Sequence, residues 1–212
     1  MAILDKTLAT CTLRYLDKTF RTRRTEQLPA LDEWLAMAAP ISDFERQALL
    51  HFQRGLNFNV HDWNEHELDT HFIGPIFALV DFSTIDFNHF SQRDIEATVD
   101  DVLLYGRVDG MVASGSREPE IPFFAFQEYK RTIDPNGDPA GQCLAAMLAG
   151  QVLNAQDAPI YGCYIVGSLW QFMALSGRQY ATSPGYSATS DDIFDIFRIL
   201  KSLKQVVIKR IT

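Results

Sequence analysis

The chain has 212 residues, 47% of them hydrophobic and 12% aromatic, which is enough apolar material for one folded domain and excludes a disordered chain. A formal net charge of −8 and a pI near 5.0 argue against a protein that coats nucleic acid by bulk charge, although local basic stretches can still attract phosphates. No uninterrupted apolar run reaches the roughly 18 residues that a membrane span needs, and charges interrupt the first 24 residues, so a cytoplasmic protein without a signal peptide is expected.

Residues 1–60 are predicted to form an N-terminal helical extension to the main domain, which covers residues 61–212. The stretch TCTLRYL within the first 24 residues alternates, and it fits either a strand or an irregular arm. A basic cluster at residues 21–24 follows it. Such clusters can contact a phosphate backbone, but they are more often solvated surface.

The apolar spacing between residues 31 and 56 is helical. Pro40 interrupts this pattern, so two helices are expected. Ser42 and Glu45 form a capping box that starts the second helix, and Gly55 is expected to end it.

A further helix is predicted from about residue 63 to residue 80. Leu68, Phe72 and Ile76 recur at fourfold spacing and should face the core. Pro75 should bend or shorten this helix, because proline lacks the backbone N–H that an inner turn needs.

Two extended segments follow, at residues 99–113 and 123–131. The stretch between them, SGSREPEIP, is rich in Gly, Ser and Pro, as connections are. An antiparallel pair of strands is the simplest arrangement of these residues.

The last third of the chain predicts a buried helix, core strands and a final helix, in a sheet of at least four strands. Asp138 and Pro139 start the buried helix, and Ser190 caps the final helix, which carries lysines towards its end as the helix dipole favours. The segments concerned are residues 138–154, residues 159–175 for one or two core strands, residues 176–183 for a short edge strand, and residues from 190 onward, with apolar positions Ile193, Phe197, Leu200 and Val207.

Three ionisable residues stand among apolar residues that should be buried: Asp109, Glu128 and Lys130. Residues i and i+2 of a strand point to one face, so Glu128 and Lys130 should project together, and Asp109 on the preceding strand can lie beside them. Burial of two carboxylates beside one ammonium is costly unless a cation or a reaction requires them. The carboxylates suit a hard cation such as Mg²⁺, and the ammonium can orient a water or stabilise charge on phosphorus.

Two structural alternatives remain open for these residues. Asp109 with Gly110 is also a hairpin signal, which would put Asp109 at an exposed turn. Glu128 and Lys130 could be a simple ion pair at a sheet edge. The apolar run FFAF before Glu128 and the better turn at residues 114–122 favour the buried arrangement.

The helix at residues 63–80 offers one more acid, Glu65. It lies three residues before Leu68 and seven before Phe72, on the stripe that faces the core, whereas Glu67 is rotated away. The alternative is that Glu65 is an acidic first-turn residue that only complements the helix dipole.

The order of these motifs resembles the PD-(D/E)XK phosphodiesterase superfamily, over about residues 62–170. A helical acid in NEHELDTHFIGPI is followed by an aspartate in GRVDGMVA, an ExK in FQEYK and a helix that opens with GQCLAAM. The superfamily includes many restriction endonucleases and the N-terminal nuclease domains of type I restriction motor subunits. The chain departs from the pattern in two places, because Val108 stands where the naming proline would be, and Gln142 is followed four residues later by Ala146 rather than tyrosine.

The resemblance implies an α/β, restriction-endonuclease-like, three-layer fold in which a central mixed sheet is flanked by helices. It implies Mg²⁺-dependent hydrolysis of nucleic acid, DNA first and RNA as an alternative, in restriction, defence or repair, with Mn²⁺ as a possible substitute metal. Two other functions stay open, which are an inactive module that binds nucleic acid or protein, and a homodimeric or partner-bound cutting subunit.

The resemblance also implies a role for each site residue. Asp109, Glu128 and the backbone carbonyl of Tyr129 would bind the metal, and Lys130 would position or activate the attacking water. Glu65 would be an accessory acid from the first core helix, and Gln142 would contact the substrate.

Other site signals are weak. Cys11, Cys143 and Cys163 are odd in number and lack CxxC spacing, which predicts buried thiols and neither a disulfide nor a zinc site. HELDTH resembles a zinc-protease sequence, but His66 and His71 are five residues apart and therefore lie on different faces of a helix. The sequence has no GxGxxG, no P-loop and no GxSxG elbow.

Overall fold

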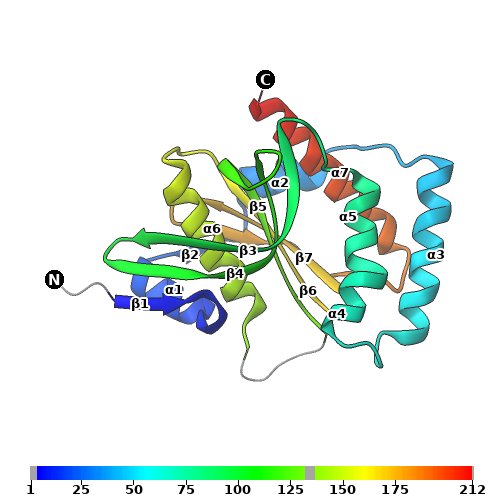
Figure 1. The fold of residues 1–212 in the computed structure, drawn as a ribbon, viewed down its shortest axis with the longest axis horizontal. Helices are drawn as coiled ribbons and strands as arrows, with labels where there is room; N and C mark the ends of the chain where they lie inside the picture. Colours follow the sequence, from blue (N-terminus) through cyan, green and yellow to red (C-terminus); the bar gives the residue numbers. More distant parts are fainter. Residues whose placement is uncertain (1–3, 132–136, 212) are drawn as a thin grey trace.

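The computed structural model describes residues 4–131 and 137–211. Within these residues the protein is α/β, with a mixed nine-stranded sheet and helices on both of its faces (Figure 1). The strand order is β1-β4-β5-β6-β7-β8-β2, with β3 paired to β4 and β9 paired to β7. The predicted mixed sheet flanked by helices is therefore confirmed.

The strands run in both directions: β1 with β4, β2 with β8 and β5 with β6 are parallel pairs, and the remaining pairs are antiparallel. The strands are β1 (Leu4–Thr7), β2 (Arg23–Arg24), β3 (Phe87–Val99), β4 (Val102–Ser114), β5 (Glu120–Lys130), β6 (Ile160–Val166), β7 (Leu169–Ser176), β8 (Gln179–Thr182) and β9 (Tyr186–Ser187). The helical segments are η1 (Leu8–Thr10), α1 (Leu13–Phe20), α2 (Pro29–Ala36), α3 (Asp43–Asn59), α4 (Glu65–Leu68), η2 (Asp69–Ile73), α5 (Gly74–Val80), α6 (Pro139–Asn154) and α7 (Asp192–Ile211).

The beginning of the chain is part of the main sheet. β1 and β2 add to it beside β4 and β8, so the described part of residues 1–60 is not purely helical. The expectation of a strand or an arm at TCTLRYL was wrong, because Thr12 caps a helix by accepting a hydrogen bond from the Tyr15 N–H at 3.1 Å. Leu16 and Phe20, one turn apart, are buried on the inner face of that helix.

α2 and α3 occupy the region predicted to be helical, and the capping box is confirmed. The Ser42 N–H donates to Glu45 Oε2 at 2.6 Å, and the Glu45 N–H donates to Ser42 Oγ at 3.3 Å. The predicted end at Gly55 was wrong, because α3 continues to Asn59. A glycine costs a helix interior only about 1 kcal/mol, and burial of Leu56 in the next position offsets this cost.

Replacing Ser42 with alanine should lower the free energy of unfolding by about 1 kcal/mol, because the Glu45 N–H loses its acceptor. Ser42→Asn keeps an acceptor at the cap and should change the stability by only a few tenths of a kcal/mol. Urea unfolding followed by circular dichroism measures both variants. An equal loss in the two variants would show that the loss does not come from the missing acceptor for the Glu45 N–H.

The helix predicted at residues 63–80 is continuous but contains a π-helical turn. α4 passes into η2 and then into α5, and the Gly74 N–H donates to the carbonyl of Asp69, five residues earlier. The wider turn accommodates Pro75, which has no N–H to donate. Leu68, Phe72 and Ile76 are buried as predicted.

Two hydrophobic cores lie on the two faces of the sheet. α1 and α6 cover one face, where Phe126 of β5 packs, and α2, α5 and α7 cover the other, with α3 outside them (Figure 1). β3 was not predicted. It forms a long antiparallel hairpin with β4, the strand that carries Asp109, and it thereby places one more set of polar side chains near the end of β5.

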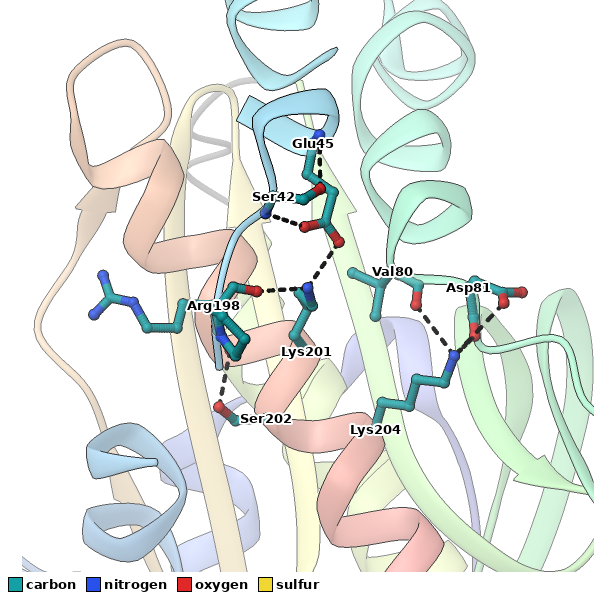
Figure 2. A network of polar contacts seen from close by, with 9 residues as sticks. Ser42, Glu45, Val80, Asp81, Arg198, Lys201, Ser202 and Lys204 are labelled. Atoms are coloured by element: carbon teal, nitrogen blue, oxygen red, sulfur yellow. Dashed lines mark hydrogen bonds and ion pairs between the residues drawn. The ribbon is translucent and has the colours of Figure 1, made fainter. Parts of the chain in front are cut away.

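Lysines of α7 hold the ends of other helices (Figure 2). Lys201 Nζ donates to the Pro40 carbonyl at 2.6 Å and lies 2.7 Å from Glu45 Oε1, at the start of α3. Lys204 Nζ donates to the carbonyl of Asp81, just past α5, where the helix dipole is negative. These two lysines of the final helix therefore stabilise the fold.

The three cysteines are buried and free, as predicted for structural thiols. Burial raises the pKa of the Cys11 thiol to about 11, an effect that nearby Lys6 partly offsets, so the thiol is protonated and unreactive at neutral pH. Among the residues that the structure describes, no helix is long and apolar enough to cross a membrane.

Candidate functional site

The candidate site lies where β4 and β5 diverge. The two strands pair up to Gly110 opposite Gln127, and Asp109 and Glu128 follow directly beyond this pair. Asp109 Oδ2 accepts a hydrogen bond from the Tyr129 N–H at 2.9 Å, so the carboxylate bridges the gap that the backbones leave. Asp109 is therefore inside a strand, and the hairpin-tip alternative is wrong.

Glu128 and Lys130 project together from β5. Lys130 Nζ lies 2.7 Å from Glu128 Oε1 and donates to the Tyr129 carbonyl at 3.1 Å. The side chain of Glu128 is 9% exposed and that of Lys130 is 24% exposed. β5 is an interior strand between β4 and β6, so the alternative of an ion pair at a sheet edge is wrong.

Glu65 reaches the same place from a third element. It is the first residue of α4, and its Oε1 atom lies 3.7 Å from Lys130 Nζ. Its side chain is 44% exposed. Glu67 instead closes a capping box with Asn64 at the start of the helix. The structure therefore brings together one side chain from α4, one from β4 and two from β5.

The charges at this site are unbalanced, since three carboxylates surround one ammonium. Burial, followed by the charges of Asp109 and Glu65, raises the pKa of Glu128 to about 7 even though Lys130 opposes the shift. Burial also raises the pKa of Asp109 and of Glu65. Burial alone would lower the pKa of Lys130, but Glu128, Asp109 and Glu65 together raise it, so the ammonium stays charged.

A second polar pair lies behind the site and was not predicted from the sequence. His89 Nε2 and Gln127 Oε1 are 2.7 Å apart, and the imidazole stacks on Phe77 at a centroid distance of 4.8 Å. Burial lowers the pKa of His89, so the ring is neutral near pH 7. A Cβ atom at Gly110 would lie 2.0 Å from Gln127 Oε1, which explains the glycine beside Asp109 as space for this pair.

Two more residues near the site were missed. Gln92 Nε2 donates to Asp109 Oδ1 at 3.0 Å, from a left-handed backbone conformation with a φ of 54° inside β3. The other is Asp69, in the π-helical turn. The pKa of the Tyr129 hydroxyl is raised by burial and then by the charges of Asp69 and Asp109. The alternation of Ile95, Ala97 and Val99 is a sequence signal for the strand that carries Gln92, but it does not tell which strand pairs with it.

Gln142 is buried in the first turns of α6, the helix that covers β5. The charge of Glu128 acts on its neighbour Cys143: the pKa of that thiol is raised first by burial and then by Glu128. Gln142 therefore lies on the covering layer, next to a residue that is close to Glu128.

The donor set at the site fits a hard cation. Asp109, Glu128 and the Tyr129 carbonyl offer only oxygen atoms, which Mg²⁺ prefers. A cationic group already lies against two of these oxygens, since Lys130 Nζ contacts Glu128 Oε1 and the Tyr129 carbonyl. No group of three or more His, Cys, Asp or Glu side chains in residues 4–131 and 137–211 has an arrangement that could hold a metal ion. Any metal here would thus depend on two carboxylates and a carbonyl.

Comparison with known proteins gives no family for this chain. No protein-family model matches the sequence, and no curated protein matches it significantly. The geometry of the site is therefore the basis for inferring what the protein does.

Proposed function

We propose that this protein is a Mg²⁺-dependent nuclease with a restriction-endonuclease-like fold, and that it hydrolyses phosphodiester bonds of nucleic acid, DNA first. One observation carries the proposal: Asp109, Glu128 and Lys130 meet at the diverging ends of two interior strands, with Glu128 almost fully buried. Such an arrangement destabilises a fold unless a cation or a reaction uses it. The order of the elements that carry the site, α4, β4, β5 and α6, further supports the resemblance.

Asp109, Glu128 and the Tyr129 carbonyl would hold the metal. When bound, Mg²⁺ supplies Lewis-acid stabilisation of the negative charge that grows on the phosphate oxygens. Glu128, whose pKa is near 7, carries a proton part of the time at neutral pH and would release it as a cation binds. Asp109 keeps its carboxylate oriented through the Tyr129 N–H and Gln92.

Lys130 would act as a cation rather than as a base, because its neighbouring carboxylates raise its pKa. Its ammonium can donate hydrogen bonds to the attacking water and to a phosphate oxygen, and so orient the first and stabilise charge on the second. Glu65, 3.7 Å from Lys130, would keep the ammonium pointing into the site.

One specific observation favours a second candidate, an inactive module that binds nucleic acid or a protein partner. Lys130 Nζ contacts two of the three oxygens that a metal would need, Glu128 Oε1 and the Tyr129 carbonyl. If the ammonium keeps this position in solution, the ion pair closes the site and takes the place of a metal.

Incubation of the purified protein with DNA and RNA, in Mg²⁺, Mn²⁺ or EDTA, separates the two candidates. We expect cleavage of nucleic acid with either metal and none in EDTA, and calorimetry should show metal binding. Protein that binds neither metal by calorimetry but still binds DNA would support the inactive module. Size-exclusion chromatography of the active fraction would report whether a dimer or a partner subunit is required.

A further inference from the structure

A pocket beside the helical segment that carries Glu65 has an aromatic wall. It lies between α3 and the segment formed by α4 and η2, and it has a volume of about 270 Å³. Figure 1 shows α3 alongside this segment. The residues that line the pocket are His51, Phe52, Gly55, Trp63 and His71.

The lining suits a flat, uncharged ring. The rings of Trp63 and His71 lie 5.4 Å apart at an angle of 33°, and His51 lies 5.8 Å from Phe52. Among the described residues that line the pocket there is no lysine, arginine, aspartate or glutamate, so these side chains offer neither a permanent positive charge for a phosphate nor a carboxylate for a cation. Stacking on aromatic side chains is how proteins hold unpaired bases, and it tolerates any base because every base has a π-face.

Gly55 keeps one wall of this pocket open. It lies inside α3, where alanine would make a more stable helix. Of the residues that the structure describes, a Cβ atom at this position would meet only Trp63, at an ordinary contact distance of 3.7 Å, so none of them excludes a larger residue by a clash. The glycine therefore leaves space beside the indole that a longer side chain would fill.

One wall of the pocket is close in the chain to an acid of the candidate site. Trp63 is two residues before Glu65, whose Oε1 atom lies 3.7 Å from Lys130 Nζ. His71 belongs to the π-helical turn that follows α4. Two residues of chain span at most about 7 Å, so Trp63 lies within that distance of Glu65, backbone to backbone, and a strand with a phosphate at Lys130 would present a nearby nucleotide to the pocket.

We propose that this pocket, which we call the base slot, binds an unpaired nucleobase of the strand that is cut. The inference rests on the proposed nuclease function and specifies its substrate, which is single-stranded or locally unpaired nucleic acid. A base inside a duplex is stacked on both sides, so it enters such a pocket only after it leaves the helix.

Tryptophan fluorescence can test the base slot directly. Trp34 and Trp170 are 1% and 0% exposed, whereas Trp63 is only partly buried, so an added base should quench the emission of Trp63 alone. Titration in EDTA with an eight-nucleotide single strand should reduce the emission, and the matched duplex should leave it nearly unchanged. Equal responses to the two ligands, or no response to the single strand, would overturn the proposal.

Filling the slot should weaken binding without touching the carboxylates. Gly55→Met should raise the Kd for the single strand about tenfold, as expected for the loss of one stacked base. Trp63→Ala should raise it by the same factor. Fluorescence anisotropy of a labelled strand measures the Kd of both variants. Gln47→Met places the same side chain at an exposed position of α3 outside the pocket, and it should bind as the wild type does. Wild-type affinity in both folded slot variants would reject the slot.

The results separate this inference from the nuclease proposal. Quenching by the single strand in a protein that never cleaves nucleic acid would reject the nuclease and keep the slot. Metal-dependent cleavage of duplex and single strand at equal rates, unaffected by Gly55→Met, would keep the nuclease and reject the slot.

Discussion

Asp109→Asn should reduce metal-dependent cleavage of nucleic acid on the order of 100- to 1,000-fold, and Glu128→Gln and Lys130→Met should each have an effect of similar size. Each substitution removes one charge from the cluster and keeps the approximate shape of the side chain. Asparagine is preferable to alanine at position 109, because its amide oxygen can still accept the Tyr129 N–H. Alanine would leave that N–H without an acceptor, at a cost of about 1–3 kcal/mol.

Initial rates on a labelled strand, at saturating Mg²⁺, measure these effects. Asp101→Asn is a matched control, because Asp101 is an exposed residue in the turn before β4, at the far end of that strand. It should keep the wild-type rate. Full activity in any of the three site variants would refute the catalytic assignment of that residue.

Glu128→Gln should make the metal-free protein more stable at pH 8, on the order of 3 kcal/mol. The pKa of Glu128 is about 7 in the folded protein, above its ordinary value of 4.5. Between these two values the folded state binds more protons than the unfolded state, so the contribution of Glu128 to stability falls as the pH rises from 4.5 to 7 and is flat above. The neutral glutamine avoids this loss, and the difference between variant and wild type should vanish at pH 4.5.

Urea unfolding in EDTA at pH 4.5 and pH 8 measures the difference. Glu120→Gln, at an exposed position of the same strand, should change the stability by the same small amount at both pH values. A Glu128→Gln protein that is less stable than the wild type at pH 8 would mean that Lys130 stabilises the charged form of Glu128 enough to cancel the effect of burial.

Added Mg²⁺ should raise the midpoint temperature of thermal unfolding of the wild type at pH 8 more than that of the Glu128→Gln variant.

The sequence predicted the features that depend on local pattern. The strand pair at residues 99–113 and 123–131 and the caps at Ser42 and Asp138 follow from residue type and spacing, and all are present. The contact between Glu128 and Lys130 follows from the twofold period of a strand.

The features that the sequence could not supply depend on contacts between distant segments. β1 is four residues long and only partly covered, and it forms a strand because it pairs with β4, which follows more than 90 residues later in the chain. β3 is rich in polar residues, so its pattern is weak without knowledge of its partner. As a consequence, Gln92 and His89 could not be placed near Asp109 from the sequence. The role of Gly110 could not be predicted for the same reason, because the pair that needs the space comes from β3 and β5.

The π-helical turn lies between Glu65 at the start of α4 and the buried residues of α5. In a regular helix, the packing of α5 would also fix the direction in which Glu65 points. Ile76, Phe77 and Val80 of α5 are seated in the core and fix how that end of the helix is rotated. Deleting one residue from the turn would rotate Glu65 by about 100° around the helix axis while α5 kept its position in the core. The orientation of the acid towards Lys130 can therefore be adjusted by the length of one turn, independently of the packing that holds the helix against the sheet.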